Sequence, residues 1–416
     1  MESENLTGAA VSRRNYVFLT LAVFLTLAVL GVSDNIKGTA LPRIQEEFRL
    51  TELHLGVILA FNSLGYLTSC TFTASLAKKI GMKNCLIAGL AMVFAAGIFI
   101  CISPGFAVLV SSFFIMNLGY GMLDISAGVI AAEIFVKKTG TMMNLSQFFF
   151  GAGATLSPFV STGLMAARFG DGVFGWRYTY LILLSFAFVP AIPALIGRLN
   201  KHSRDRESAG YLKMLGKPVV WLLTLILAFS AASEVGMSAW LVNYLEKAYS
   251  FSGEQAALRL SVYFICFTAA RLVLGPLIDR IGFISSLAIG TAFAGAMIVA
   301  GVLAGEPGTP LLLAAGIGIG LVYPTVMAAV AKLFSDDVDK AITVVLTAIG
   351  VVIVPANFLV GGIITRARAL LAELPGEAGV RIAYSSGFMV LGLCSFCAFT
   401  FALILRAKLK KNGRLV

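Results

Sequence analysis

Twelve apolar runs, each long enough to cross a bilayer, constrain what this chain can fold into. They cover approximately residues 16–42, 52–77, 83–103, 106–134, 143–168, 176–198, 217–246, 254–278, 284–304, 309–333, 341–365 and 382–406. A bilayer core needs roughly 20 helical residues at about 1.5 Å per residue. Hydrophobic residues make up 58% of the 416 residues and charged residues 13%, which excludes a pair of ordinary soluble domains.

The apolar runs are expected to be helices. A backbone in hydrocarbon must satisfy its own hydrogen bonds, which leaves helices or closed barrels. The runs are too long for barrel strands and lack their alternation of apolar and polar residues. The sequence therefore predicts an all-α, multi-pass membrane protein surrounded by the lipid bilayer.

The net charge of +11 comes from Lys and Arg residues that collect on one side of the membrane. Basic pairs occur at Arg13–Arg14, Lys78–Lys79 and Lys137–Lys138, and more follow in 198–217 and the C-terminal tail. The positive-inside rule then predicts that both termini are cytoplasmic, in a cell (inner or plasma) membrane. Because no soluble domain offers a basic face, nucleic acid is not expected as a partner.

Signals for other chemistry are weak. His54 and His202 are the only histidines, and the six cysteines lie in or beside apolar runs, so neither a metal site nor a disulfide framework is expected. No nucleophile–base pair or phosphate-cradling loop is visible, so we expect no enzyme and no cofactor. The N-terminus MESENLTGAAVSRRN has no cleavage pattern, so the first helix is expected to serve as its own signal.

The sequence divides into two related halves. The longest polar stretch between apolar runs lies near the middle, which predicts a six-helix bundle over 1–200, a cytoplasmic linker over 201–216 and a second six-helix bundle over 217–416. At a shift of about 200 residues, ASLAKKIG aligns with GPLIDRIG, Asp34 with Glu234, and GYGMLD with GIGLVY. These matches indicate a parallel repeat, and transporters built this way bind substrate near the midplane between the halves.

The two-times-six arrangement and GPLIDRIG (275–282) resemble the major facilitator superfamily, although Lys78 stands where the first-half loop would carry an Asp. GYGMLD (119–124), MNLSQFFFGAGA (143–154), SEVGMSAWLVNYLE (233–246) and YPT (323–325) resemble its fucose/glucose proton symporter branch. The resemblance implies two pseudo-symmetric bundles working by alternating access, with functional carboxylates at Asp124 and Glu234. The first-helix carboxylate of the fucose symporter would fall at Gly38, one turn after Asp34.

Asp124 follows a stretch that has no charge from Pro104 onward. A charged side chain at this depth costs about 2.5–3.5 kcal/mol unless it faces protein or water, so we expect Asp124 to face a central cavity. Burial favours the protonated form of a carboxylate, which suits a proton carrier. Tyr120, one turn earlier, is expected to hydrogen-bond it. The alternative is a neutral Asp that only ties two helices together.

Two other acidic positions are candidates for proton coupling. Glu234 lies deep in the seventh run. After it, Trp240 and Asn243 are three residues apart and lie on overlapping helix faces, and an aromatic beside an amide is what a sugar site tends to offer. An interfacial aromatic belt is the alternative for Trp240. Asp34 lies in the first run with Asn35 and Lys37; it forms either a structural ion pair with Lys37 or a proton-coupling group that lines the cavity.

Further polar residues fall at helix starts or inside apolar runs. Arg271 in the eighth run either pairs with a carboxylate or binds an anionic substrate. Gln147 in the fifth run is either a hydroxyl ligand or an interhelical hydrogen-bond partner. The remaining predicted substrate-binding residues are Asn144, Tyr323 and Asn357, and the remaining predicted gating or structural residues are Asp279, Arg280 and Glu133, the last within reach of Lys137.

Together these features predict a monomeric, proton-coupled symporter of a small polar solute such as a monosaccharide, with sodium coupling not excluded. The first alternative is a proton-driven efflux antiporter of drug-like or other small compounds. The second is a membrane receptor that binds a ligand without moving it.

Overall fold

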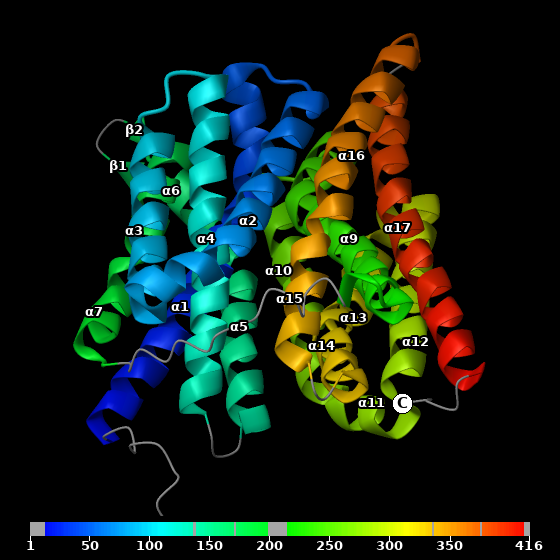
Figure 1. Cartoon of the computed structure of the whole chain (residues 1–416). Helices are drawn as coiled ribbons and strands as arrows, with labels where there is room; N and C mark the ends of the chain where they lie inside the picture. Colours follow the sequence, from blue (N-terminus) through cyan, green and yellow to red (C-terminus); the bar gives the residue numbers. More distant parts are fainter. Residues whose placement is uncertain are drawn as a thin grey trace, which may run out of the picture.

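The computed structural model describes residues 13–135, 139–169, 172–198, 214–334, 337–374 and 377–411. This part of the chain contains 12 helical segments that are long and apolar enough to cross a membrane. The twelve predicted spans and the all-α class are therefore confirmed, and the ribbon in Figure 1 is almost entirely helical.

The first half begins with long helices and ends with a span built from two short ones. Its elements are α1 (Arg13–Phe48), α2 (Glu52–Ile80), α3 (Met82–Cys101), α4 (Phe106–Ile134), α5 (Thr139–Ala166), β1 (Arg168–Phe169), β2 (Gly172–Val173), α6 (Gly175–Ser185) and α7 (Phe188–Ile196). The two strands form a small antiparallel hairpin in which Arg168 pairs with Val173.

The second half repeats this plan with more interruptions. Its elements are α9 (Pro218–Tyr249), α10 (Gly253–Val273), α11 (Gly275–Ile281), α12 (Phe283–Ala304), the 3-10 turn η1 (Glu306–Gly308), α13 (Thr309–Gly320), α14 (Val322–Leu333), α15 (Val338–Ala348), α16 (Gly350–Leu370) and α17 (Ala378–Lys411). The polar stretch predicted to separate the halves lies largely outside the described residues, which omit 199–213.

The repeat seen in the sequence is also present in the backbone. Gly81 ends α2 with φ 88° and ψ 152°, and Gly282 ends α11 with φ 89° and ψ 146°. Both values lie where a side chain would be strained, so glycine suits each turn. A Cβ at Gly119 would press on the carbonyl oxygen of Gly89, and one at Gly318 on that of Gly290. Corresponding helices therefore cross at corresponding glycines.

Helix α1 is continuous through the polar segment that interrupts its apolar run. Two bonds within the helix make this possible: Lys37 Nζ donates to Asp34 at 2.7 Å, and Asn35 Nδ2 donates to the Gly31 carbonyl at 2.9 Å. The helix also passes Pro42 and continues to Phe48, six residues beyond the predicted end.

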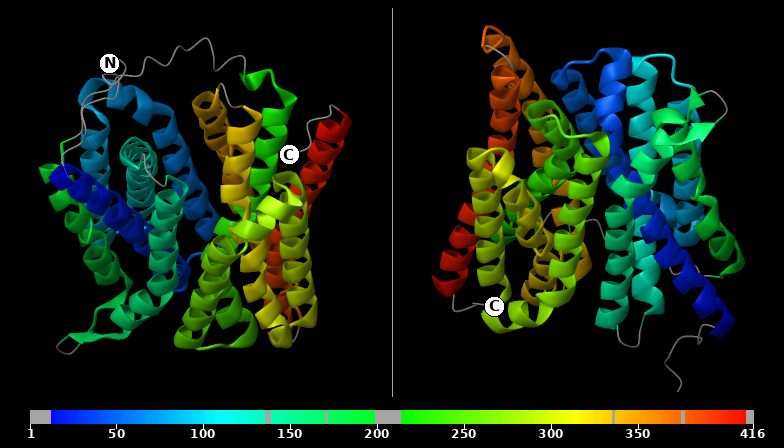
Figure 2. Two further views of the ribbon diagram at one scale, coloured as in Figure 1. Left: turned by 90° about the horizontal axis from the view of Figure 1, so that it is seen from below. Right: turned by 180° about the vertical axis from the view of Figure 1, so that it is seen from behind.

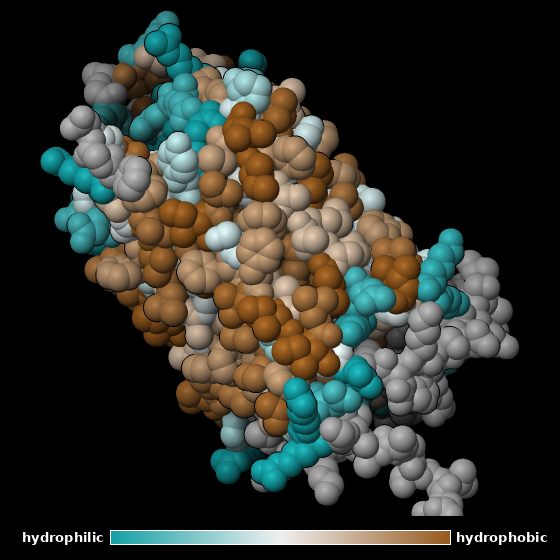
Figure 3. Space-filling model, turned by 90° about the vertical axis from the view of Figure 1, so that its left-hand side faces the viewer, coloured by the Kyte–Doolittle hydropathy of each residue, from teal (hydrophilic) through white to brown (hydrophobic). Residues whose placement is uncertain are grey.

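The two halves form two bundles that stand side by side (Figure 1; Figure 2). Contacts between the bundles are made by α1 with α9, α2 with α16, and α5 with α10. One end of the molecule, here called the terminal face, is where α1 begins and α17 ends. The other, here called the closed face, is where α1 ends and α2 begins. In Figure 3, apolar residues cover the middle of the first bundle's outer surface and hydrophilic ones gather at both ends, as a membrane protein requires.

Candidate functional site

A group of polar side chains, here called the interior cluster, lies where the two bundles face each other. Its members are Asp34 and Lys37 of α1, Tyr66 of α2, Asp124 of α4, Gln147 of α5, Glu234 of α9, Arg271 of α10 and Tyr323 of α14. All except Lys37, which is 5% exposed, are half-buried. Hydrogen bonds and electrostatic interactions connect them across the bundle interface.

Asp124 is held by a tyrosine from a neighbouring helix. The Tyr66 hydroxyl donates to Asp124 Oδ2 at 2.6 Å, and Tyr323 interacts electrostatically with Asp124 from the other bundle. The expected bond from Tyr120 is absent: the Tyr120 hydroxyl is buried and forms no hydrogen bond with any described residue, and the carboxylate that acts on it electrostatically is Asp34. Tyr66 was not among the predicted residues, since nothing in one sequence tells which face of α2 meets α4.

Asp34 and Lys37 form an ion pair of 2.7 Å within α1, with side chains 26% and 6% exposed. Across the interface, Glu234 interacts electrostatically with Arg271, Asp34 and Lys37. Asp34 and Glu234, which occupy equivalent positions of the repeat, therefore face the same region. Acidic and basic groups of both bundles therefore meet in one region between the bundles.

Arg271 links both bundles without a direct carboxylate partner. Its Nε donates to the Gly320 carbonyl at 2.9 Å and its Nη1 to Gln147 Oε1 at 3.3 Å. The guanidinium lies 4.1 Å from the ring centroid of Phe267. It forms no ion pair with any carboxylate of the described residues, and Glu234 acts on it only at longer range. The guanidinium thus keeps capacity for a further acceptor.

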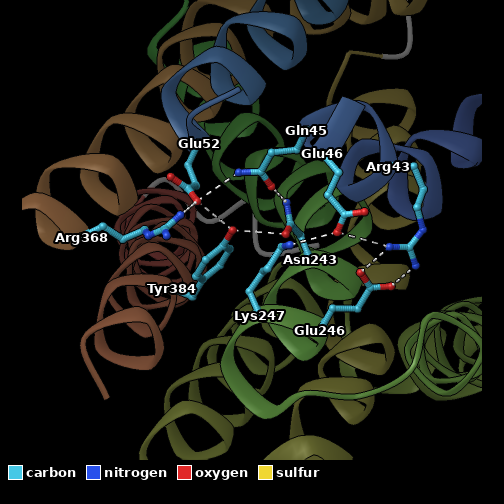
Figure 4. A network of polar contacts seen from close by, with 9 residues as sticks. All are labelled: Arg43, Gln45, Glu46, Glu52, Asn243, Glu246, Lys247, Arg368 and Tyr384. Carbon is cyan, nitrogen blue, oxygen red and sulfur yellow. Dashed lines mark hydrogen bonds and ion pairs between the residues drawn. The ribbon is translucent and has the colours of Figure 1, made fainter. Parts of the chain in front are cut away.

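A second group of polar residues, the closed-face network, joins the bundles near the end of α1 (Figure 4). Arg43, Gln45, Glu46 and Glu52 come from the first bundle, and Asn243, Glu246, Lys247, Arg368 and Tyr384 come from the second. Among the described residues, ion pairs between the bundles occur only here. These ion pairs therefore hold the two bundles together at the closed face.

Glu52 is the centre of the buried part of this network. Its carboxylate is 3% exposed and accepts from Arg368, from Gln45 Nε2 at 3.1 Å and from the Tyr384 hydroxyl at 3.1 Å. The Tyr384 hydroxyl also lies 3.2 Å from Asn243 Oδ1, while Asn243 Nδ2 donates to Gln45 Oε1 at 3.0 Å. Each polar group in this ring forms a hydrogen bond with another member, as is usual for buried polar groups.

The more exposed part of the network contains two further ion pairs. Arg43 donates to both oxygens of Glu246, at 3.1 and 2.7 Å, and Lys247 donates to Glu46 at 3.1 Å. None of these four residues was among the predicted site residues. The available signal was that opposite charges fall at the ends of the first and seventh spans, the two spans that the repeat makes equivalent.

Four predicted binding residues are buried in the core or bonded to groups outside the interior cluster, and they are not part of the site proposed below. Trp240 is fully buried in the core, and Asn243 belongs to the closed-face network. Asn35 is bonded within its own helix, and Asn357 donates to Ser63 Oγ at 3.0 Å across the α16–α2 contact. Asn243 and Asn357 thus each bond to another helix, whereas Asn35 bonds within its own.

The remaining predicted residues lie at the terminal face or beyond what can be described. Asp279 and Arg280 are exposed on α11, and Glu133 is exposed near the end of α4. The side chain of Asn144 and all of Lys137 fall outside the described residues.

A family model described as the Major Facilitator Superfamily matches residues 23–352 and, in a second overlapping match, 236–414. The Escherichia coli L-fucose-proton symporter is 21% identical over 425 residues, covering 94% of this chain and 93% of that protein. The E. coli 3-(3-hydroxy-phenyl)propionate transporter is 24% identical, covering 94% and 96%. The Saccharomyces cerevisiae protein named Bypass of stop codon protein 6 is 23% identical over 62% of this chain, and the match covers 57% of that protein. The match to the E. coli galactose-proton symporter covers 37% of that protein.

Solved structures share the fold over nearly the whole chain. A crystal structure of the E. coli fucose:proton symporter superposes with a TM-score of 0.64 at 18% identity, covering 94% of this chain and 99% of that one. A bacterial homolog of the human lysosomal transporter Spinster gives a TM-score of 0.76 at 14% identity, covering 94% and 98%.

Proposed function

The chain belongs to the major facilitator superfamily, and from the interior cluster we propose that it couples uptake of a monosaccharide or similar small polar solute to proton entry. Family membership makes it a multi-pass membrane transporter rather than an enzyme. In the proposed mechanism the two bundles, roughly 1–200 and 217–416, rock about the cluster of a single chain and open it to each side in turn.

The observation that carries the proposal is the environment of Asp124. It is half-buried between spans, and its hydrogen-bond partner is the neutral Tyr66 hydroxyl rather than a fixed cation. A carboxylate without a permanent countercharge can exist with or without its proton at modest cost, whereas an Arg-paired one resists protonation. Asp124 is therefore the proposed proton carrier, with Glu234 and Asp34 as the groups that sense its charge.

Hydroxyl-rich solutes fit the polar groups around these carboxylates. Gln147 and Tyr323 offer both donors and acceptors near the bundle interface, and both are half-buried. The names of two relatives, the L-fucose-proton and galactose-proton symporters, support a sugar as solute and a proton rather than sodium as the coupling ion. Tyr120 forms no hydrogen bond with Asp124, and the predicted role of Asn144 stays a prediction.

The closed-face network indicates which side of the membrane the protein is closed to in the proposed state. In the proposed orientation both termini are cytoplasmic, so the closed face is external and the closed-face network lies between the interior cluster and the outside. Solute entry from outside then requires the closed-face network to separate, and Glu52 must leave Arg368 and Tyr384.

The test is uptake into proteoliposomes under an imposed pH gradient, with a panel of labelled sugars. We expect wild-type protein to concentrate at least one sugar and to move protons with it. Asp124→Asn should lose accumulation while retaining exchange of labelled for unlabelled solute. If Asp124→Asn still concentrates the solute, the proton role of Asp124 is wrong; drug-stimulated proton release without sugar uptake would instead support the efflux antiporter.

Arg271 favours one second candidate, a solute that carries a carboxylate. The half-buried guanidinium has no direct ion-pair partner among the described residues, and one full-length relative is named a transporter of 3-(3-hydroxy-phenyl)propionate. Aromatic and short-chain carboxylates therefore belong in the same panel. Uptake of a carboxylate that disappears in Arg271→Gln, with no uptake of sugars, would select this candidate.

A further inference from the structure

A cavity of about 920 Å³ lies beside the closed face, between the C-terminal part of α5 and the N-terminal part of α10. The two helices touch where Gly151 packs on Thr268, and the cavity occupies the space between that contact and the closed face. Thr39 of α1 and Val242 of α9 form its back wall. The cavity is separate from the interior cluster, none of whose members lines it.

The cavity is apolar along most of its length and charged at one end. Phe159 and Leu258 line it and are 66% and 56% exposed, so its side walls continue into the apolar outer surface. Phe159 lies seven residues before the end of α5, about 10 Å deeper in the membrane than the helix end. Arg43, Glu246 and Glu254 line the end nearest the closed face.

The charged end has an excess of negative charge. Arg43 is neutralised by its two bonds to Glu246. Glu254 is exposed in the first turn of α10 and forms no ion pair with any described cation. The lining therefore offers one partly exposed guanidinium and one carboxylate without an ion-pair partner among the described residues, both at the end of the cavity nearest the closed face, where lipid headgroups are expected.

We propose that this cavity binds a phospholipid with a primary amine in its headgroup, such as phosphatidylethanolamine. The headgroup phosphate contacts Arg43, the ammonium donates to Glu254, and one acyl chain lies along Phe159 and Leu258. The volume is on the scale of a pocket for one drug-sized molecule, about 300–1,000 Å³, so the second chain remains in the bilayer. Through Arg43, the bound lipid touches an ion pair that fastens the two bundles.

The headgroup choice follows from the chemistry of Glu254. A primary ammonium donates hydrogen bonds to a carboxylate, whereas a trimethylammonium offers charge alone. An anionic headgroup without an amine would meet two carboxylates against one guanidinium. We therefore expect phosphatidylethanolamine to bind better than phosphatidylcholine, and both better than phosphatidylglycerol.

Native mass spectrometry of the full chain, titrated with the three lipids of identical acyl chains, tests the proposal. Wild-type protein should retain phosphatidylethanolamine about fivefold more tightly than phosphatidylcholine, the upper range for one exposed ion contact. Glu254→Gln should remove this difference. Equal retention of the two lipids by wild-type protein, or an unchanged preference in Glu254→Gln, would overturn the proposal.

A second, independent test of the lipid site fills the cavity with a large side chain. Gly163 lines the cavity and a Cβ there would meet nothing within 4 Å, so Gly163→Trp can project into the lipid's space. Gly128 on α4 is equally unobstructed and does not line the cavity, so Gly128→Trp is the matched control. Gly163→Trp should lose the retained phosphatidylethanolamine and Gly128→Trp should keep it; identical retention in both would contradict the site. The readout is lipid mass, so it stands independently of the proposed transport activity.

Discussion

The interior cluster and the closed-face network both place carboxylates between the bundles, but the partners of these carboxylates differ. In the network, Glu52, Glu246 and Glu46 each face an Arg or Lys of the opposite bundle. In the cluster, Asp34 pairs with Lys37 of its own helix, Asp124 meets a neutral tyrosine hydroxyl, and Glu234 acts on Arg271 only at longer range, so no ion pair of the cluster joins the two bundles among the described residues.

This difference separates two uses of the same chemical group. A carboxylate paired with a fixed cation keeps its charge, so it can fasten two surfaces but is poorly suited to carry a proton. A carboxylate with neutral donors can change its charge as the surroundings change. The closed-face network is thus suited to hold the two bundles together, and the interior cluster is suited to gain and lose a proton.

The largest effect is expected for Asp124→Asn, which removes the titrating group and preserves its shape. Accumulation driven by a pH gradient should fall to background, while solute exchange continues. Labelled-solute uptake and exchange in the same proteoliposomes measure both. Glu246→Gln serves as the comparison at the closed face, and it should retain accumulation; equal losses in both variants would mean that the carboxylates of the two regions do not differ in function.

Glu52→Gln should have the next largest effect, on the equilibrium between open and closed faces. It removes the charge that holds Arg368 and Tyr384, and a hydrogen bond to a charged group contributes about 1.5–3 kcal/mol, or roughly 10-fold to 100-fold in population. Distances between spin labels on the two bundles at the closed face report this population. The broader, longer distances expected for Glu52→Gln should be absent from wild-type protein.

Glu47 provides the control for that experiment. It lies in the same part of α1 but bonds Trp176 at 2.6 Å and Arg177 at 2.8 Å, both within its own bundle. Glu47→Gln changes the same charge without touching the opposite bundle, so the label distances should stay as in wild-type protein. Opening by Glu47→Gln to the same extent would mean that surface charge, and not the network, sets the closed state.

Tyr66→Phe should slow proton-coupled uptake by about tenfold, because it removes the donor that holds the Asp124 carboxylate. The initial rate of uptake at saturating solute measures this effect. Tyr120→Phe removes a hydroxyl that forms no hydrogen bond with Asp124, and its rate should match wild-type protein. A lower uptake rate for Tyr120→Phe than for Tyr66→Phe would instead support the predicted pairing of Tyr120 with Asp124.

The smallest effect is expected for Arg43→Gln. Arg43 is 36% exposed, and partly exposed ion pairs contribute about 0.2–1 kcal/mol, so the open population should rise less than about fivefold. The same spin-label distances report it. The difference from wild-type protein should shrink as salt is raised, since screening acts on exposed pairs; an effect that is independent of salt would place Arg43 among the buried members of the network.

Much of the fold could be predicted from the sequence, and much of the site could not. Long apolar runs predict spans because hydrocarbon leaves the backbone few options, and the shift of about 200 residues predicts the equivalence of Asp34 and Glu234. Trp240 and Asn243 were assigned to the solute site because helical spacing gives the residues that share a face. Spacing does not tell which face meets the cluster and which meets the other bundle.

The sequence by itself determined twelve helices in two repeats and a few ionisable residues within apolar spans, because these properties depend on local composition and the membrane. Only the tertiary structure decided the partners: Tyr66 with Asp124, 58 residues apart; Gln147 with Arg271, 124 apart; and Glu52 with Arg368, 316 apart. A helix fixes the direction of each side chain about its own axis, but the rotation and crossing of neighbouring helices bring particular side chains together.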